Sequence, residues 1–293
     1  MFHHILFAQT LTDSIAPFTY LLQECSQANI MTSFFSATSD ENFNNFLKQI
    51  CKQYHVTKET LLILTDSPTI SQYALKSEFV CFGFTISNSH LRFPHLPLVI
   101  EGFDEIDLAY LQREFAHVLH KPALLCTSKR CEIWEIPLED VPILYHMMEC
   151  IPYQLFRREP LGTLEEEIEK QRGYIEHIYP IFAHGIWGIY LKETHTLIGR
   201  IGITSSMINN EMEYELEYFI GKNFTRQGYA TECVHTLLDY IKELGIASVC
   251  VRIHKDNIAS FGVLSHCNYP YYEYPSEHSQ IRCFYIYLHL TDR

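Results

Sequence analysis

The segment YELEYFIGKNFTRQGYATECVHTLLDYIKELG, residues 214–245, constrains the fold more than any other part of the chain. Its pattern predicts a strand that runs into a glycine-containing turn, and the turn opens a helix that ends at Gly245. The first amides of a helix have no partner inside the helix, and the positive end of the helix dipole lies behind them. Such a turn binds phosphate groups, and Gly228 lets a ligand approach the backbone. A single glycine here is also typical of an ordinary tight turn.

The length and composition predict two folded domains. The chain has 293 residues, of which 47% are hydrophobic and 19% charged, and this is enough apolar material for two cores. The net charge of -13 disfavours nucleic acid and favours cationic or amine partners. The first residues do not resemble a secretory signal, and no run approaches the length of a membrane span. We therefore expect a cytoplasmic protein without a membrane partner.

The ten cysteines favour neither a zinc site nor a disulfide framework. They contain no C-x-x-C pair, and most of them lie inside apolar runs. We expect buried free thiols and no metal, as is usual where thiols stay reduced.

The first part of the chain, residues 1–125, alternates short apolar runs with helical periodicity. This alternation is typical of a parallel α/β sheet with crossover helices. The predicted strands cover residues 3–8, 29–35, 61–65, 79–84 and 97–102, and the predicted helices cover residues 43–54 and 70–77. A composition change within residues 121–130 marks the domain boundary.

The second domain, residues 130–293, is expected to hold a mixed sheet. The predicted strands are 132–136, 185–194, 195–204, 212–220, 247–253 and 282–290, and helices are expected up to 148 and at 163–178, 231–244 and 257–267. Thr163 is the expected N-cap of the second of these helices, ahead of an acidic first turn. The closing strand could pair within the domain or across a homodimer.

Three motifs in this half resemble the GNAT acetyltransferases of the RimJ/RimL type. They are RQGYATE at 226–232, VRIHKDNIAS at 251–260 and VLSHCNY at 263–269, and the resemblance extends over residues 131–290. It implies a mixed-sheet acyl-CoA N-acyltransferase fold, acetyl-CoA as cofactor, and direct transfer of its acetyl group to a primary amine. The acceptor would be a protein N-terminus or a small amine.

The resemblance also implies the residues that bind the cofactor. The turn that holds the pyrophosphate of coenzyme A would consist of Thr225, Arg226, Gln227, Gly228, Tyr229, Ala230 and Thr231. Backbone groups of Tyr218, Phe219 and Ile220 would pair with the pantetheine arm where this strand splays from its neighbour. Asn257 and Ser260 would reach the cofactor from the later helix, and Asn257 could also be the N-cap of that helix.

Three glutamates on one strand are the candidate general bases. Because side chains alternate along a strand, Glu213, Glu215 and Glu217 should point to the same face. Neighbouring carboxylates raise one another's pKa, which suits a base that takes a proton from an ammonium group. Glu217 is the first choice by its position next to the splay, Glu215 the second and Glu213 the third. A solvated outer face of the sheet is the alternative interpretation.

The general acid is not identified by the motifs. Some members of the GNAT family, which this half resembles, use a tyrosine four residues beyond the Ser260 position to protonate the leaving thiolate. This chain has Leu264 at that position. Tyr229, Tyr269 or water would have to supply the proton.

The opening ILFAQTLTDS, residues 5–14, resembles the start of haloacid-dehalogenase-type (HAD) hydrolases. Ala8 stands in the place of the nucleophilic aspartate, Asp66 matches the metal-binding segment, and Thr32 or Ser33 the phosphate-binding motif. Alanine can neither form an aspartyl-phosphate nor hold magnesium. The expectation is a degenerate, non-catalytic HAD-like domain, and the alternative is a generic Rossmann-like domain.

Two other functions stay open at this point. The second domain could be a non-catalytic acyl-CoA-binding sensor whose state the first domain reports. The first domain could be a phosphatase that acts through Asp13 or Asp66, which the alanine at position 8 opposes.

Overall fold

The computed structural model describes residues 1–9, 18–36, 40–85, 92–103, 106–149, 160–180, 184–208, 211–276 and 279–289. The chain forms two compact units, Met1–Ala123 and Leu124–Arg293. Their division falls inside the segment 121–130, where the composition changes. Within the described ranges, no helix has the length and apolar character needed to cross a membrane.

The N-terminal unit is built on a parallel sheet, as predicted. Its strands are β1 (His4–Gln9), β2 (Met31–Ser36), β3 (Leu61–Thr65), β4 (Val80–Thr85) and β5 (Val99–Glu101). The helices are α1 (Thr19–Gln27), α2 (Asp40–Tyr54), α3 (Pro68–Lys76) and α4 (Leu108–Val118), and the sequence interpretation missed α1 and α4.

Both faces of this sheet are covered, which explains why its central strands are largely apolar. All residues of β1 and β3 are buried. Ile5 and Phe7 pack on one face with residues of α1 and α4, whereas Leu6 and Ala8 pack on the other with residues of α2 and α3. Helices on both faces are what a parallel sheet requires.

The strand order of this sheet is β2-β1-β3-β4-β5. This is the flavodoxin-like order of a doubly wound sheet, in which β3 pairs with β1, whereas the Rossmann order places β3 beyond β2. The parallel sheet is as predicted, and a Rossmann-like fold is not confirmed. A HAD-like fold is not confirmed.

The C-terminal unit is built on an eight-stranded mixed sheet in the order β12-β13-β11-β10-β9-β8-β7-β6. Its strands are β6 (Leu124–Thr127), β7 (Cys131–Trp134), β8 (Ile186–Leu191), β9 (Leu197–Ile208), β10 (Glu211–Ile220), β11 (Ser248–His254), β12 (Tyr271–Tyr274) and β13 (Ile281–Tyr287). Only β10 and β11 pair in parallel among the described strands of this sheet. The short strands β6 and β12 were not predicted.

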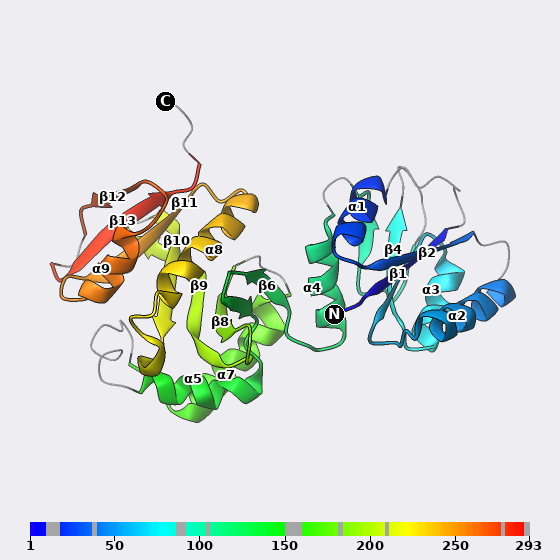
Figure 1. The fold of residues 1–293 in the computed structure, drawn as a ribbon, viewed down its shortest axis with the longest axis horizontal. Helices are drawn as coiled ribbons and strands as arrows, with labels where there is room; N and C mark the ends of the chain where they lie inside the picture. The colour runs from blue at the N-terminus through cyan, green and yellow to red at the C-terminus, as the bar shows by residue number, and fades with distance from the viewer. Residues whose placement is uncertain are drawn as a thin grey trace. The chain divides into compact units, whose positions relative to one another are not determined.

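Helices cover the two faces of this sheet unequally. They are α5 (Val141–Met148), α7 (Leu164–Gly173), α8 (Tyr229–Glu243) and α9 (Ile258–Ser265), with short helical segments η2 (Leu138–Asp140), η3 (Tyr174–Ile178) and η4 (Lys222–Phe224). The ribbon shows α8 crossing the strands while α5 and α7 lie together at one end (Figure 1). Buried residues of α8 share a core with Leu216 of β10, whereas those of α5 pack with Phe219. Because 216 and 219 point to opposite faces, α8 and α5 cover opposite sides of β10.

Candidate functional site

The edge of β10 that faces β11 is largely unpaired. β10 pairs with β9 over its whole length, from Glu211 to Ile220, but with β11 it shares a single pair, Glu215 with Cys250. Beyond Glu215 the two strands therefore separate within the described residues. The edge of β10 beyond this pair could bind an extended ligand that would lie there as an additional strand.

The turn that follows β10 presents a row of backbone amides. Arg226 and Gly228 have left-handed backbone conformations, with φ of 60° and 82°, and α8 begins directly after Gly228. Among the described residues the amides of 226–231 donate to no carbonyl of the chain, whereas that of Glu232 donates to the Gly228 carbonyl. Open amides at the positive end of a 15-residue helix favour the binding of an anion. The seven residues predicted to bind pyrophosphate, 225–231, make up this turn.

A second segment of the chain, distant in sequence, holds this turn. Arg130, between β6 and β7, donates from its backbone amide to Glu232 Oε1 and from Nε to Glu232 Oε2, both at 2.7 Å. Its Nη1 donates to the Gln227 carbonyl at 3.1 Å, and its guanidinium lies 4.3 Å from the centre of the Tyr229 ring. Ser128 Oγ donates to Glu232 Oε1 at 2.7 Å. Sequence reasoning missed Arg130, since the contact spans 102 residues.

Asn257 and Ser260 lie at the start of α9, where the motifs placed them. Asn257 is the N-cap, because its Oδ1 accepts from the Ser260 amide at 3.1 Å. The Ser260 carbonyl accepts from Tyr218 Oη at 2.9 Å, so the first turn of α9 is tied to β10. Burial is the main cause that raises the pKa of Tyr218 to about 12.

The three glutamates share a face of β10 but differ in environment. Their β9 partners are Ser206, Thr204 and Gly202, two residues apart each time, as expected for side chains on one side. Glu215 is 1% exposed, and both of its carboxylate oxygens accept from Arg252, at 2.9 and 2.5 Å. This buried ion pair makes Glu215 a structural partner of β11 and does not favour it as a base.

Glu217 lies close to an aromatic hydroxyl and a cation. Burial, followed by the charge of Glu217, raises the pKa of Tyr174, and Arg200 acts in the opposite direction. Tyr174 belongs to η3, after α7, and Arg200 is paired in register with Phe219. Glu217 shares the α5 side of the sheet with Phe219, lies two residues beyond the last pair of β10 with β11, and is only partly buried.

Glu213 faces a group of tyrosines on the same side of the sheet. Across the sheet, Glu215 pairs with Cys250, which pairs with Tyr285. Tyr285 pairs in turn with Tyr272, and Ser248 pairs with Tyr287. A hydrogen bond to Tyr274, burial and the charge of Glu213 contribute to raising the pKa of Tyr287 to about 12. This face therefore combines carboxylates with aromatic rings, a combination suited to cations.

Both tyrosines proposed as general acid make contacts with other side chains. Tyr229 lies under the Arg130 guanidinium. Tyr269 Oη donates to Asp239 at 2.6 Å, ten residues along α8 from its first residue. Leu264, which stands at the position of the missing tyrosine, is 3% exposed and packs in the core.

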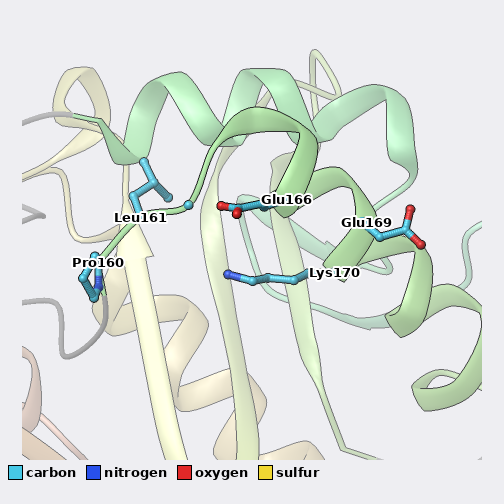
Figure 2. A pocket seen from close by; sticks show the side chains of 6 residues that line it. Pro160, Leu161, Glu166, Glu169 and Lys170 are labelled. Atoms are coloured by element: carbon cyan, nitrogen blue, oxygen red, sulfur yellow. The ribbon is translucent and has the colours of Figure 1, made fainter.

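A surface pocket opens at the beginning of α7 and contains none of the predicted site residues. Its lining consists of Pro160, Leu161, Gly162, Glu166, Glu169 and Lys170. Figure 2 shows Glu166 and Lys170 extending to the same side of the helix, while Glu169 points to the other. Glu166 is occupied in the capping box with Thr163, the N-cap that the sequence predicts. This pocket gives no indication of chemistry.

The described residues that were matched to HAD-type motifs lie in or directly after β1, β2 and β3 of the N-terminal unit. Ala8 is buried, and its carbonyl accepts from Thr65. Ser33 Oγ is bonded to His4 Nε2 at 2.9 Å in the middle of β2, and Asp66 is buried after β3. Asp13 lies outside the described residues.

Metal-ligating side chains do not gather in the part of the chain that the structure describes. The nine described cysteines are free thiols, and Cys51, Cys126 and Cys267 are only partly buried. Cys150 lies outside the described residues.

Comparison with known proteins gives a family for this half of the chain. Residues 138–269 match the acetyltransferase (GNAT) domain family. A relative from Bacillus subtilis, described as the uncharacterized N-acetyltransferase YnaD, is 25% identical over 145 residues, which cover 47% of this chain and 78% of the relative. The residues matched to the family, 138–269, include α5, the splayed strands, the turn before α8 and α9.

Solved structures also resemble this half. An acetyltransferase from Agrobacterium tumefaciens is 20% identical, with a TM-score of 0.46, covering 55% of this chain and 92% of its own. RimL, a ribosomal L7/L12 alpha-N-protein acetyltransferase in complex with coenzyme A, is 15% identical, with a TM-score of 0.47, covering 56% and 97%. The prediction of a GNAT domain and of acyltransferase activity is confirmed at the level of the family match.

Proposed function

We propose that the C-terminal unit, a GNAT acetyltransferase domain, transfers the acetyl group of acetyl-CoA directly to a primary amine. The observation that carries the proposal is the joint presence of an unpaired β10 edge and an open-amide turn at the start of α8. The first suits an extended amide-containing arm, and the second suits a pyrophosphate. Coenzyme A contains an extended amide-containing arm and a pyrophosphate in one molecule. When it is acetylated, it supplies a thioester as acyl donor.

The residues that would hold the cofactor fit its chemistry. Gly228 has a φ of 82° and leaves room, since an added Cβ would meet only Arg130 Nη2 at 3.5 Å. The turn 225–231 would donate amides to the diphosphate, and residues 218–220 would pair with the pantetheine arm. Asn257 would contribute its side-chain amide nitrogen, because its oxygen is already used as the α9 cap. An amide of the open β10 edge would stabilise the oxyanion.

Glu217 is the proposed general base. It shares a face with Glu213 and Glu215, stands next to the splay, and is partly exposed, whereas Glu215 is paired to Arg252. A carboxylate in this position would accept a proton from the acceptor's ammonium group and leave the amine free to attack the thioester carbonyl. The thiolate that leaves would be protonated by Tyr229 or by water.

The acceptor would be an amine that carries a positive charge before it reacts. The face that holds the glutamates continues over β13 as Tyr285 and Tyr287, and Glu213 lies beside these rings. Carboxylates and ring faces both attract an ammonium group. A peptide N-terminus and a small amine each satisfy this requirement.

The test is an acceptor screen with the full-length protein. Free coenzyme A thiol is measured while acetyl-CoA is incubated with small amines of increasing charge and with peptides that have free N-termini. Thiol release that requires one class of amine, with acetylation of that amine verified by mass, supports the proposal. Tight binding of acetyl-CoA without transfer to any amine would contradict it and indicate a non-catalytic sensor.

A further inference from the structure

Arg130 lies at the phosphate-binding turn although it comes from a different part of the sheet. It belongs to the connection between β6 and β7, whereas the turn joins β10 to α8. Its guanidinium contacts the turn at two points, the Gln227 carbonyl and the Tyr229 ring. Its Nη2 is also the nearest atom to the position that a Cβ on Gly228 would take. A positive charge is thus fixed against the residues that would face the diphosphate.

The Arg130 charge is also paired with the carboxylate of Glu232. Glu232 lies in the first turn of α8, where its negative charge would oppose the binding of an anion at the same helix end. Its carboxylate instead turns toward Ser128 and Arg130 and accepts three hydrogen bonds from them. Burial, the largest single effect, raises the pKa of Glu232, but the hydrogen bonds from Ser128 and Arg130 and the Arg130 charge together lower it, which favours the ionised carboxylate.

We infer that Arg130 is a positioning residue for the cofactor: it neutralises Glu232 and fixes the Gln227 carbonyl, so that the amide-lined turn accepts a diphosphate. This inference rests on the proposed function, because it assumes a coenzyme A ligand. Arg130 acts through Glu232 and the turn, and the ion pair between Nε and Oε2 is the contact that carries the effect. Removing the guanidinium leaves the Glu232 carboxylate without its counter-charge beside the anion site, although Ser128 Oγ and the backbone amide of residue 130 still donate to it.

The experiment compares dissociation constants for coenzyme A and for dephospho-coenzyme A, which keeps the diphosphate but lacks the 3'-phosphate. Calorimetry on the full chain requires no knowledge of the acceptor. Arg130→Ala should weaken binding of both ligands by about tenfold, since one charge-assisted contact is worth a factor of this order. The ratio of the two dissociation constants should stay unchanged, because both ligands contain the diphosphate on which the effect of Arg130 acts.

The double variant Arg130→Ala/Glu232→Gln separates positioning from general damage to the fold. Removing the unpaired charge should restore affinity to within about threefold of the wild type. Arg113→Ala is the matched control, because Arg113 also pairs with a glutamate and lies over a tyrosine ring, but in the N-terminal unit. It should leave both dissociation constants unchanged.

The outcomes distinguish this inference from the proposed function. If the wild type does not bind coenzyme A, the proposed function fails and the inference fails with it. If the wild type binds and Arg130→Ala binds equally well, only the inference is wrong. A double variant no better than the single one also overturns it, since Arg130 would then not act through Glu232.

Discussion

At the scale of single residues, β10 separates the proposed general base from a glutamate with a structural partner. Glu217 and Glu215 are two residues apart on the same face, yet Glu215 is buried in a two-point pair with Arg252 and Glu217 is partly exposed near Tyr174. If an acceptor binds on this face, the position along the strand relative to the splay leaves Glu217 more accessible to it than Glu215. The sequence predicted that the three glutamates share a face of the strand, but it could not show that Arg252 pairs with the middle one, Glu215.

Glu217→Gln should reduce kcat by about 100-fold or more, because a positioned general base contributes an effect of this order. The dissociation constant for acetyl-CoA should change by less than about twofold, since the side chain lies on the acceptor side. Steady-state kinetics with the amine found in the screen, together with calorimetry, provides both values. Glu213→Gln is the control and should retain most of kcat; equal losses in the two variants would show that the base is assigned wrongly.

Arg252→Leu should destabilise the C-terminal unit by about 3 kcal/mol, because it leaves the buried Glu215 carboxylate without its counter-charge. Denaturant unfolding measures this change. Arg172→Ala removes an exposed pair with Glu169 and should cost under about 1 kcal/mol. A double variant Arg252→Leu/Glu215→Leu should recover much of the loss. If Arg252→Leu were as stable as Arg172→Ala, the pair would not have the structural role described.

At the scale of elements, the start of α9 combines a structural cap with a proposed ligand contact. Asn257 is the N-cap, and Tyr218 ties the same turn to β10 through the Ser260 carbonyl. A side chain in this place therefore influences both helix stability and the distance between α9 and the splayed edge. The two effects can be separated because aspartate also caps helices but offers no amide nitrogen.

Asn257→Ala should cost about 1 kcal/mol of stability through the lost cap and weaken acetyl-CoA binding by a few-fold. Asn257→Asp should keep the cap and restore stability, yet bind acetyl-CoA no better than the alanine variant. Thermal unfolding and calorimetry on the same preparations measure the two effects. Full recovery of binding in Asn257→Asp would mean that Asn257 acts through the helix alone.

Elements with strong local signals were predictable, and those that depend on distant partners were not. Thr163 caps α7 as expected, because the capping signal lies within four residues. The glycine turn before α8 likewise follows from local chemistry. By contrast, β12 is four residues long and is defined by its pairing with β13. The Arg130–Glu232 contact joins residues 102 positions apart, which no local pattern indicates.

At the scale of the whole molecule, each unit has cores of its own. Cores in the N-terminal unit lie on both faces of the parallel sheet, and those of the C-terminal unit lie between the mixed sheet and its helices. The sequence predicted a parallel and a mixed sheet, but not the order of the parallel strands, because order is set by which strands meet after folding. Because the cores are separate, the stability of each unit can depend on solution conditions in its own way.

His4 should make the stability of the N-terminal unit depend on pH. It is buried in β1, and burial, followed by the charge of His3, lowers its pKa to about 4 from 6.5. The neutral ring thus stabilises the fold above pH 6.5, and this contribution is lost as the pH falls from 6.5 toward 4. Between pH 7 and 5, allowing for solvent screening, the unfolding free energy should fall by about 1 kcal/mol more in the wild type than in His4→Gln. Parallel slopes would contradict this.

The most direct test of the central claim is a calorimetric titration of the full-length protein with acetyl-CoA, repeated with Gly228→Trp. The wild type should bind saturably, and the variant should not bind, because an indole at this left-handed position distorts the turn and fills the space of the diphosphate. ATP serves as the control for general phosphate affinity. A folded Gly228→Trp protein that binds acetyl-CoA as tightly as the wild type would show that the cofactor does not occupy this turn.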